Sequence, residues 1–133
     1  MAALSSGCAV DTNVLIYHLH GALSARAEEL LAAAIQAGAR VSVVTRIELM
    51  CWPQHTADSL AATHRLLDLF HERPLAGALV ERTISVRREA RIRLADAVIA
   101  ATALEDGVPL MTRNTKDFAA VAGLTVVDPE SVG

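Results

Sequence analysis

Residues 94–112, LADAVIAATALEDGVPLMT, decide the fold of this chain. From Ala97 to Leu104 the stretch is apolar nearly all round, which is typical of a helix buried in a core. Gly107 ends this predicted helix, and residues 109–112 then form the short apolar run of a buried strand. A buried helix followed at once by a buried strand indicates an α/β sheet.

The rest of the chain continues this alternation. Further strands are predicted at residues 8–10, 41–44 and 124–127. Helices are predicted at residues 14–21, 24–38, 45–53, 57–71 and 77–93, with Ser24 and Thr45 among their capping residues. Strands that alternate with helices predict an α/β fold, in which a central, mainly parallel sheet is flanked by helices. No linker or repeat interrupts the pattern, so we expect a single domain over residues 1–133.

Composition excludes several classes of protein. Of the 133 residues, 53% are hydrophobic and 20% charged, which argues against disorder. No run approaches the roughly 20 apolar residues of a membrane span, and the N-terminus lacks the pattern of a signal peptide. We therefore expect a cytoplasmic protein, with Cys8 and Cys51 as buried, reduced thiols. The net charge of −3 does not by itself indicate a nucleic-acid-binding protein.

Several acidic residues follow strands or begin helices at one edge of the predicted sheet. Asp11 follows the first strand directly, and Glu48 lies about one helical turn beyond the second. Asp96 opens the buried helix, which must start at the same edge because it runs back toward the next strand. Thr112 and Asn114 follow that strand, with Asp117 one turn later. Ligands of parallel sheets bind at the carboxyl ends of the strands, so these side chains are expected to converge.

Converging carboxylates raise one another's pKa unless a cation lies between them. Oxygen ligands without His or Cys favour Mg²⁺ or Mn²⁺, and such an ion can activate a water against a phosphodiester. Taken alone, Asp11 or Asp96 could simply cap a helix. Glu48 is harder to explain in that way, because it interrupts an apolar run.

Basic residues gather in one segment of this acidic chain. The segment holds Arg82, Arg87, Arg88, Arg91 and Arg93, offset only by Glu89. Two interpretations stay open: a solvated helix face, or contact with a phosphate backbone beside the acidic pocket.

Two other families place an aspartate after the first strand. A haloacid-dehalogenase-like phosphotransferase needs a second aspartate two residues on, where this chain has Asn13. A receiver domain needs paired acids near Asp11 and a lysine after a late strand, whereas no acid accompanies Asp11 and the only lysine is Lys116. Neither pattern is met.

Five blocks of sequence resemble the PIN-domain family, and specifically VapC-type toxins of toxin–antitoxin pairs. They occur in family order and span nearly the whole chain: VDTNVLI at 10–16, TRIEL at 45–49, LADAVIAATA at 94–103, LMTRNTKDF at 110–118 and LTVVDP at 124–129. Two turns depart from the commoner pattern. Cys51-Trp52-Pro53 and Arg91-Ile92-Arg93 stand where many relatives have a glycine.

The resemblance implies a three-layer PIN-like fold and Mg²⁺-dependent cleavage of RNA, with Mn²⁺ as a possible substitute. It also implies a homodimer and inhibition by a cognate VapB-type antitoxin. By position, the catalytic and metal-binding residues are Asp11, Glu48, Asp96 and Asp117. The supporting polar groups are Thr12, Asn13, Thr112 and Asn114, and the candidate RNA-binding residues are Arg87, Arg88 and Arg91. The alternative is a catalytically idle PIN fold that only binds RNA or protein.

Overall fold

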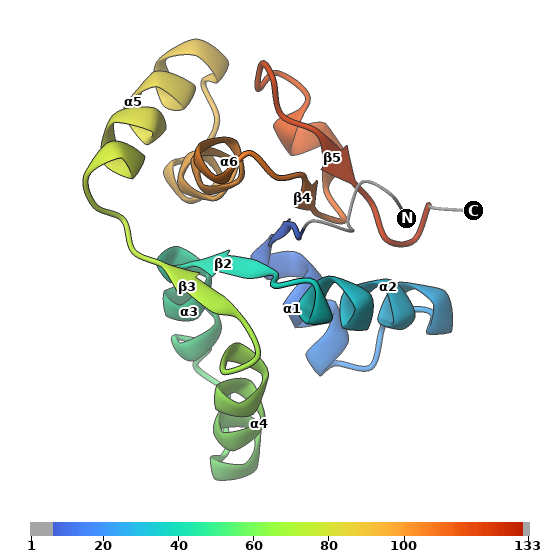
Figure 1. Ribbon diagram of the computed structural model, residues 1–133. Helices are drawn as coiled ribbons and strands as arrows, with labels where there is room; N and C mark the ends of the chain where they lie inside the picture. Colours follow the sequence, from blue (N-terminus) through green and yellow to red (C-terminus); the bar gives the residue numbers. More distant parts are fainter. Residues whose placement is uncertain (1–6, 132–133) are drawn as a thin grey trace.

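The computed structural model describes residues 7–131 and places a five-stranded sheet between two layers of helices (Figure 1). The strands lie in the order β3-β2-β1-β4-β5, and every neighbouring pair is parallel. They are β1 (Ala9–Val10), β2 (Arg40–Ser42), β3 (His71–Arg73), β4 (Leu110–Met111) and β5 (Val126–Val127). The predicted three-layer α/β fold is confirmed. Residues 1–6, which bear on the signal-peptide prediction, lie outside the described residues.

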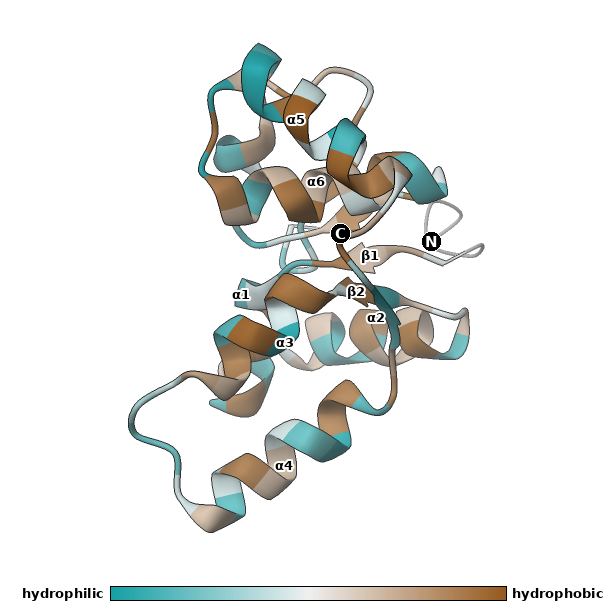
Figure 2. Ribbon diagram, turned by 90° about the vertical axis from the view of Figure 1, so that its left-hand side faces the viewer, coloured by the Kyte–Doolittle hydropathy of each residue, from teal (hydrophilic) through white to brown (hydrophobic). Residues whose placement is uncertain are grey.

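The helices divide between the two sides of the sheet (Figures 1 and 2). On one side are α1 (Thr12–Leu19), α2 (Ala25–Gln36), α3 (Val43–Met50) and α4 (Ala57–Leu67). On the other are α5 (Ala78–Ala90), α6 (Leu94–Asp106) and the short 3₁₀ helix η2 (Thr115–Phe118). Figure 2 shows α6 as largely apolar, and its residues from Asp96 to Ala103 are all buried, as predicted. None of the helices within residues 7–131 has the length and apolarity that crossing a membrane requires.

The two short central strands join two separate cores. Val10 and Met111 pair in register and contribute to the core that includes α1 and α2. Ala9 and Leu110 also pair, and they contribute to the core on the side of α5 and α6. Side chains alternate between the two faces of a strand, so two residues in each strand are enough to place one side chain in each core.

Several predicted boundaries are wrong: the helix predicted at 77–93 ends at Ala90, because Arg91 adopts a left-handed conformation. Two further errors also have a local reason. The strand predicted at 41–44 ends at Ser42, because the Ser42 hydroxyl accepts a hydrogen bond from the backbone N–H of Val44 and caps α3. Val43 and Val44 are therefore helical, and Thr45 is not the cap.

The second error concerns residues 57–71. The helix ends at Leu67, because His71 pairs with Arg40 and begins β3. Charged edge strands of this kind carry no apolar pattern that a sequence could reveal. Cys51 is also exposed rather than buried, whereas Cys8 is buried as predicted.

Candidate active site

The carboxylate of Asp11 lies at the edge of the sheet where all strands end. Asp11 is the N-cap residue of α1, yet its side chain makes no capping hydrogen bond. Its Oδ2 instead accepts a hydrogen bond of 2.8 Å from the hydroxyl of Thr112, which follows β4. Only 5% of Asp11 is exposed. The capping interpretation therefore does not account for this carboxylate, which faces across the sheet edge.

Glu48 reaches the same edge from α3. Its Oε1 accepts a hydrogen bond of 2.6 Å from the hydroxyl of Thr12, the residue after Asp11. The Thr12 hydroxyl is also hydrogen-bonded to the hydroxyl of the buried Thr45 at 2.9 Å. Thr12 thus fixes Glu48 beside the first turn of α1.

Asp96 comes from the other side of the sheet. It lies in the first turn of α6, whose N-cap residue is Arg93, so the capping interpretation is wrong for Asp96 as well. A carboxylate in the first turn of a helix is stabilised by the helix dipole. The side chain of Asp96 is 12% exposed and accepts a hydrogen bond of 3.3 Å from Nε of Arg93.

These three carboxylates, which we call the acid cluster, influence one another electrostatically. Burial first, and then the charges of Asp96 and Glu48, raise the pKa of Asp11 to about 6 against the opposing hydrogen bond from Thr112. An acid with such a pKa is held ionised at neutral pH at a cost in free energy. A bound cation would remove that cost, which marks the acid cluster as a place that favours positive charge.

Asp117 and the supporting polar residues surround the acid cluster at different depths. Asp117 is exposed in η2, and its charge acts on Arg93. The buried Thr112 hydroxyl accepts hydrogen bonds from the backbone N–H of Asn114 at 3.0 Å and from Nδ2 of Asn13 at 3.4 Å. Oδ1 of Asn13 in turn accepts a hydrogen bond from the backbone N–H of Arg113. The side chains of Asn13 and Thr112 therefore form one network around Asp11. Asn114 joins this network through its backbone N–H rather than through its side chain.

The acid cluster fits a divalent metal ion in its chemistry. Its donors are all carboxylate oxygens, the set that Mg²⁺ and Mn²⁺ prefer. Within residues 7–131, however, no three His, Cys, Asp or Glu side chains stand in the arrangement of a ready metal site. Glu48 accepts a hydrogen bond from Thr12 and Asp96 from Arg93, so an ion would have to compete with these donors for the carboxylate oxygens.

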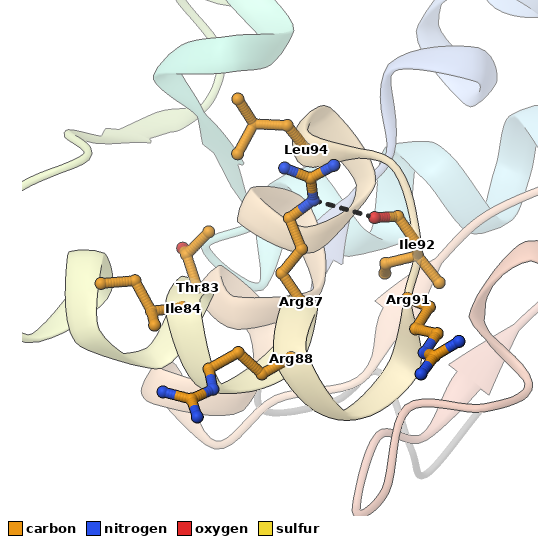
Figure 3. Close-up of a pocket in the computed structure, with 7 residues that line it drawn as sticks. All are labelled: Thr83, Ile84, Arg87, Arg88, Arg91, Ile92 and Leu94. Carbon is orange, nitrogen blue, oxygen red and sulfur yellow. Dashed lines mark hydrogen bonds between the residues drawn. The ribbon is translucent and has the colours of Figure 1, made fainter.

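The three arginines predicted to bind RNA surround a separate pocket of about 560 Å³ (Figure 3). Figure 3 shows their guanidinium groups pointing in different directions, and Nε of Arg87 donates a hydrogen bond to the backbone oxygen of Ile92. The structure therefore brings Arg87, Arg88 and Arg91 to one pocket without aiming them at one point. The sequence analysis placed Arg93 in the basic segment but did not predict its pairing with Asp96, although its position three residues before Asp96 was a usable signal.

An apolar groove of about 600 Å³ adjoins Glu48 on the other flank, and we call it the Trp52 groove. The ring of Trp52 contacts the rings of His20 and His55, with centroids 5.7 and 5.1 Å away and the rings nearly perpendicular. His55 is held on both sides, by the backbone oxygen of Leu49 and by Ser59. The groove is lined by residues of α1, α3, α4 and the α3–α4 turn, chiefly Ile16, Leu19, Leu49, Pro53, Ala62 and Thr63.

Known proteins agree with this architecture. The model of the PIN domain matches residues 8–124. A chain of a toxin–antitoxin complex from Klebsiella pneumoniae is 30% identical, with a TM-score of 0.74 over 95% of this chain and all of that one. A chain of DNA-bound VapBC from Salmonella typhimurium has a TM-score of 0.82 at 18% identity, over 92% of this chain and 98% of that chain. A chain of FitAcB from Neisseria gonorrhoeae has a TM-score of 0.77 at 23% identity, covering 94% and 99%.

No curated protein matches the sequence. The family model nevertheless covers most of the chain, including Asp11, Glu48, Asp96 and Asp117. The solved structures at 18% and 23% identity share the fold of this chain. The chain therefore belongs to the PIN domain family.

Proposed function

We propose that this protein is a Mg²⁺- or Mn²⁺-dependent endoribonuclease toxin of the VapC type. The observation that carries the proposal is the meeting of Asp11, Glu48 and Asp96 at one sheet edge, where burial and mutual repulsion raise the pKa of Asp11. Membership of the PIN domain family and the 30% identity to a chain of a toxin–antitoxin complex support it.

In this proposal the acid cluster holds the ion, and Asp117 supports it from the rim. The ion would supply a water of lowered pKa and neutralise charge on the phosphodiester. Thr112 holds Asp11 in place, and Thr12 holds Glu48. Because Thr112 is fully buried and Thr12 is only 6% exposed, these hydroxyls restrict the carboxylates before the substrate arrives.

We further propose that a cognate VapB-type antitoxin binds in the Trp52 groove. The structural relatives are chains of toxin–antitoxin complexes, and the groove is an apolar surface that ends at Glu48. An apolar antitoxin segment in the groove would bury Trp52, which is 40% exposed, and would stand beside the acid cluster. Binding and inhibition would then occur at one place. The family resemblance extends the proposal to a cytoplasmic homodimer.

Cleavage of RNA by the purified chain tests the enzymatic proposal. We expect endonucleolytic products with Mg²⁺ and none after addition of EDTA. Asp11→Asn, a variant of nearly the same volume, should be inactive while keeping the fold. RNA that is bound but left intact by the wild-type chain at all Mg²⁺ and Mn²⁺ concentrations would favour the idle binding module instead.

Growth of the host tests the toxin proposal separately. Strong induction of the wild-type chain alone should arrest growth, and Asp11→Asn should not. Co-expression with the antitoxin should restore growth and yield a stable complex. Normal growth under induction of the wild-type chain would count against a toxin even if RNA is cleaved in vitro.

A further inference from the structure

Arg93 is the cation that the fold itself places beside the acid cluster. It is the N-cap residue of α6, with extended backbone angles, and its side chain makes no capping hydrogen bond. The turn before it is well fixed, because Arg91 adopts a left-handed conformation with φ of 55° and Arg87 donates to the backbone oxygen of Ile92. The backbone of Arg93 is therefore anchored, whereas its side chain is 80% exposed.

The guanidinium of Arg93 pairs with one carboxylate and lies within the electrostatic influence of two more. Its Nε lies 3.3 Å from Oδ2 of Asp96. The hydrogen bond and the charge of Asp96, followed by the charges of Asp117 and Glu48, raise the pKa of Arg93. An arginine stays charged at any physiological pH, so its positive charge is a permanent part of this site.

The contact is nevertheless weak enough to exchange. An exposed side chain held by a single hydrogen bond contributes little to the free energy of unfolding, because it loses rotational freedom when the bond forms. The same planar guanidinium suits a phosphate group, which it can bind through two parallel N–H donors. A divalent ion on Asp96 would compete with Arg93 for that carboxylate and repel it.

We propose that Arg93 is a mobile counter-ion of the active site, which pairs with Asp96 in the metal-free chain and moves to a phosphate of the bound RNA when a metal ion takes Asp96. This inference rests on the proposed function and goes beyond it by assigning a substrate-binding residue outside the acid cluster. The proposal predicts opposite effects on metal binding and on RNA binding. Removing the charge should tighten metal binding and weaken RNA binding.

The metal arm of the test uses the chain without RNA. Titration calorimetry with Mn²⁺ at low ionic strength compares the wild type with Arg93→Gln and Arg93→Lys. We expect Arg93→Gln to bind Mn²⁺ about two- to fivefold more tightly, the range that the energies of exposed ion pairs allow. Arg93→Lys should stay near the wild type. The control is Arg46→Gln, which removes another exposed arginine paired with a carboxylate, Glu72, outside the acid cluster.

The RNA arm measures KM for cleavage at saturating Mg²⁺ and its dependence on salt. Arg93→Gln should raise KM several-fold and reduce the salt slope by about one phosphate contact. A purely structural role would lower both affinities together, along with the melting temperature. Arg46→Gln should leave both quantities unchanged.

Equal Mn²⁺ affinity in the wild type, Arg93→Gln and Arg46→Gln would overturn the inference and leave the proposed nuclease intact. So would a KM that Arg93→Gln does not change. A wild-type chain that neither binds Mn²⁺ nor cleaves RNA would overturn the inference and the proposed function together.

Discussion

The hydroxyl of Thr112 donates a hydrogen bond of 2.8 Å to Oδ2 of Asp11 and thereby joins the end of β4 to the end of β1. Both residues are buried, and the two strands are neighbours in the sheet. The bond favours the charged form of Asp11 and so opposes the effect of burial on its pKa. Thr112 therefore lowers the pKa of Asp11 and favours its ionised form, although burial has the larger effect.

Replacing Thr112 by Val should move the pH profile of cleavage. The change keeps the shape of the side chain but removes the hydrogen bond, so the pKa of Asp11 should rise. We expect the acid limb of the profile to shift upward by about one pH unit, since a hydrogen bond to a charged group contributes about that much. Cleavage rates from pH 5 to 9 measure this. An unshifted acid limb would show that Asp11 does not set the profile.

Mg²⁺ or Mn²⁺ should raise the melting temperature, and more so at pH 7 than at pH 5. The ion binds the folded acid cluster, and it binds best when Asp11 is ionised, above its pKa of about 6. Asp11→Asn, Glu48→Gln and Asp96→Asn should each lose most of the shift. Thermal denaturation with and without the ion measures it, with EDTA as the reference. A shift that survives all three changes would place the ion elsewhere.

Without a metal ion, the chain should be less stable at pH 7 than at pH 4.5. The folded pKa of Asp11 lies above its ordinary value of 3.8, so the folded state holds the extra proton between these two values. Stability is therefore lost as pH rises from about 4 to 6, by up to about 3 kcal/mol for a shift of this size. Asp11→Asn removes the ionisation and should be more stable than the wild type at pH 7 in EDTA. Urea denaturation at pH 4.5 and 7 tests both statements.

Asp117 should matter more to cleavage than Asn114. Asp117 carries a charge that reaches the site, whereas Asn114 contributes its backbone N–H to Thr112. Asp117→Asn should lower cleavage substantially and weaken Mg²⁺ affinity less than Asp96→Asn does, as expected of an outer ligand. Asn114→Ala should be milder still. A silent Asp117→Asn together with an inactive Asn114→Ala would reverse the two roles.

The alternation of strands and helices was readable because each buried element carries its own apolar pattern, as residues 97–104 show. The common edge of Asp11 and Thr112 also followed from the parallel topology alone. Two features did not follow. The edge strand β3 consists of polar residues that only pairing with β2 orders, and the rotamers of Glu48 and Asp96 depend on Thr12 and Arg93. The pairing of β3 with β2 and the contact of Thr12 with Glu48 join distant segments and leave no local trace in sequence, whereas the spacing of Arg93 and Asp96 is local.

The contribution of Arg87 and Arg88 of α5, and of its C-cap Arg91, to RNA affinity remains a prediction. Arg87 is partly engaged by the backbone oxygen of Ile92, and Figure 3 shows the three side chains diverging. The joint change of Arg87, Arg88 and Arg91 to Gln should weaken RNA binding and lower its salt slope, with a smaller effect on the cleavage rate of bound RNA. Fluorescence anisotropy over a range of KCl concentrations measures this. An unchanged slope would leave a solvated helix face.

Trp52 offers a direct test of antitoxin binding, because it is the only tryptophan in the chain. Its ring contacts those of His20 and His55, and His55 is hydrogen-bonded in turn to Leu49 and Ser59, so these neighbours restrict the Trp52 ring in the free chain. An antitoxin segment without tryptophan that covers Trp52 should shift its emission to shorter wavelength. Trp52→Ala should weaken the complex by roughly tenfold or more, as loss of a central aromatic anchor does.

Leu75→Ala is the control for this change, since Leu75 is also 40% exposed but does not line the groove. It should leave antitoxin affinity unchanged. RNA provides the contrasting ligand: a groove that serves the antitoxin should respond to the antitoxin segment and not to RNA added in EDTA. Emission that shifts with RNA, together with full antitoxin affinity in Trp52→Ala, would instead assign the groove to the substrate. In that case inhibition would have to come from a surface other than the one that ends at Glu48.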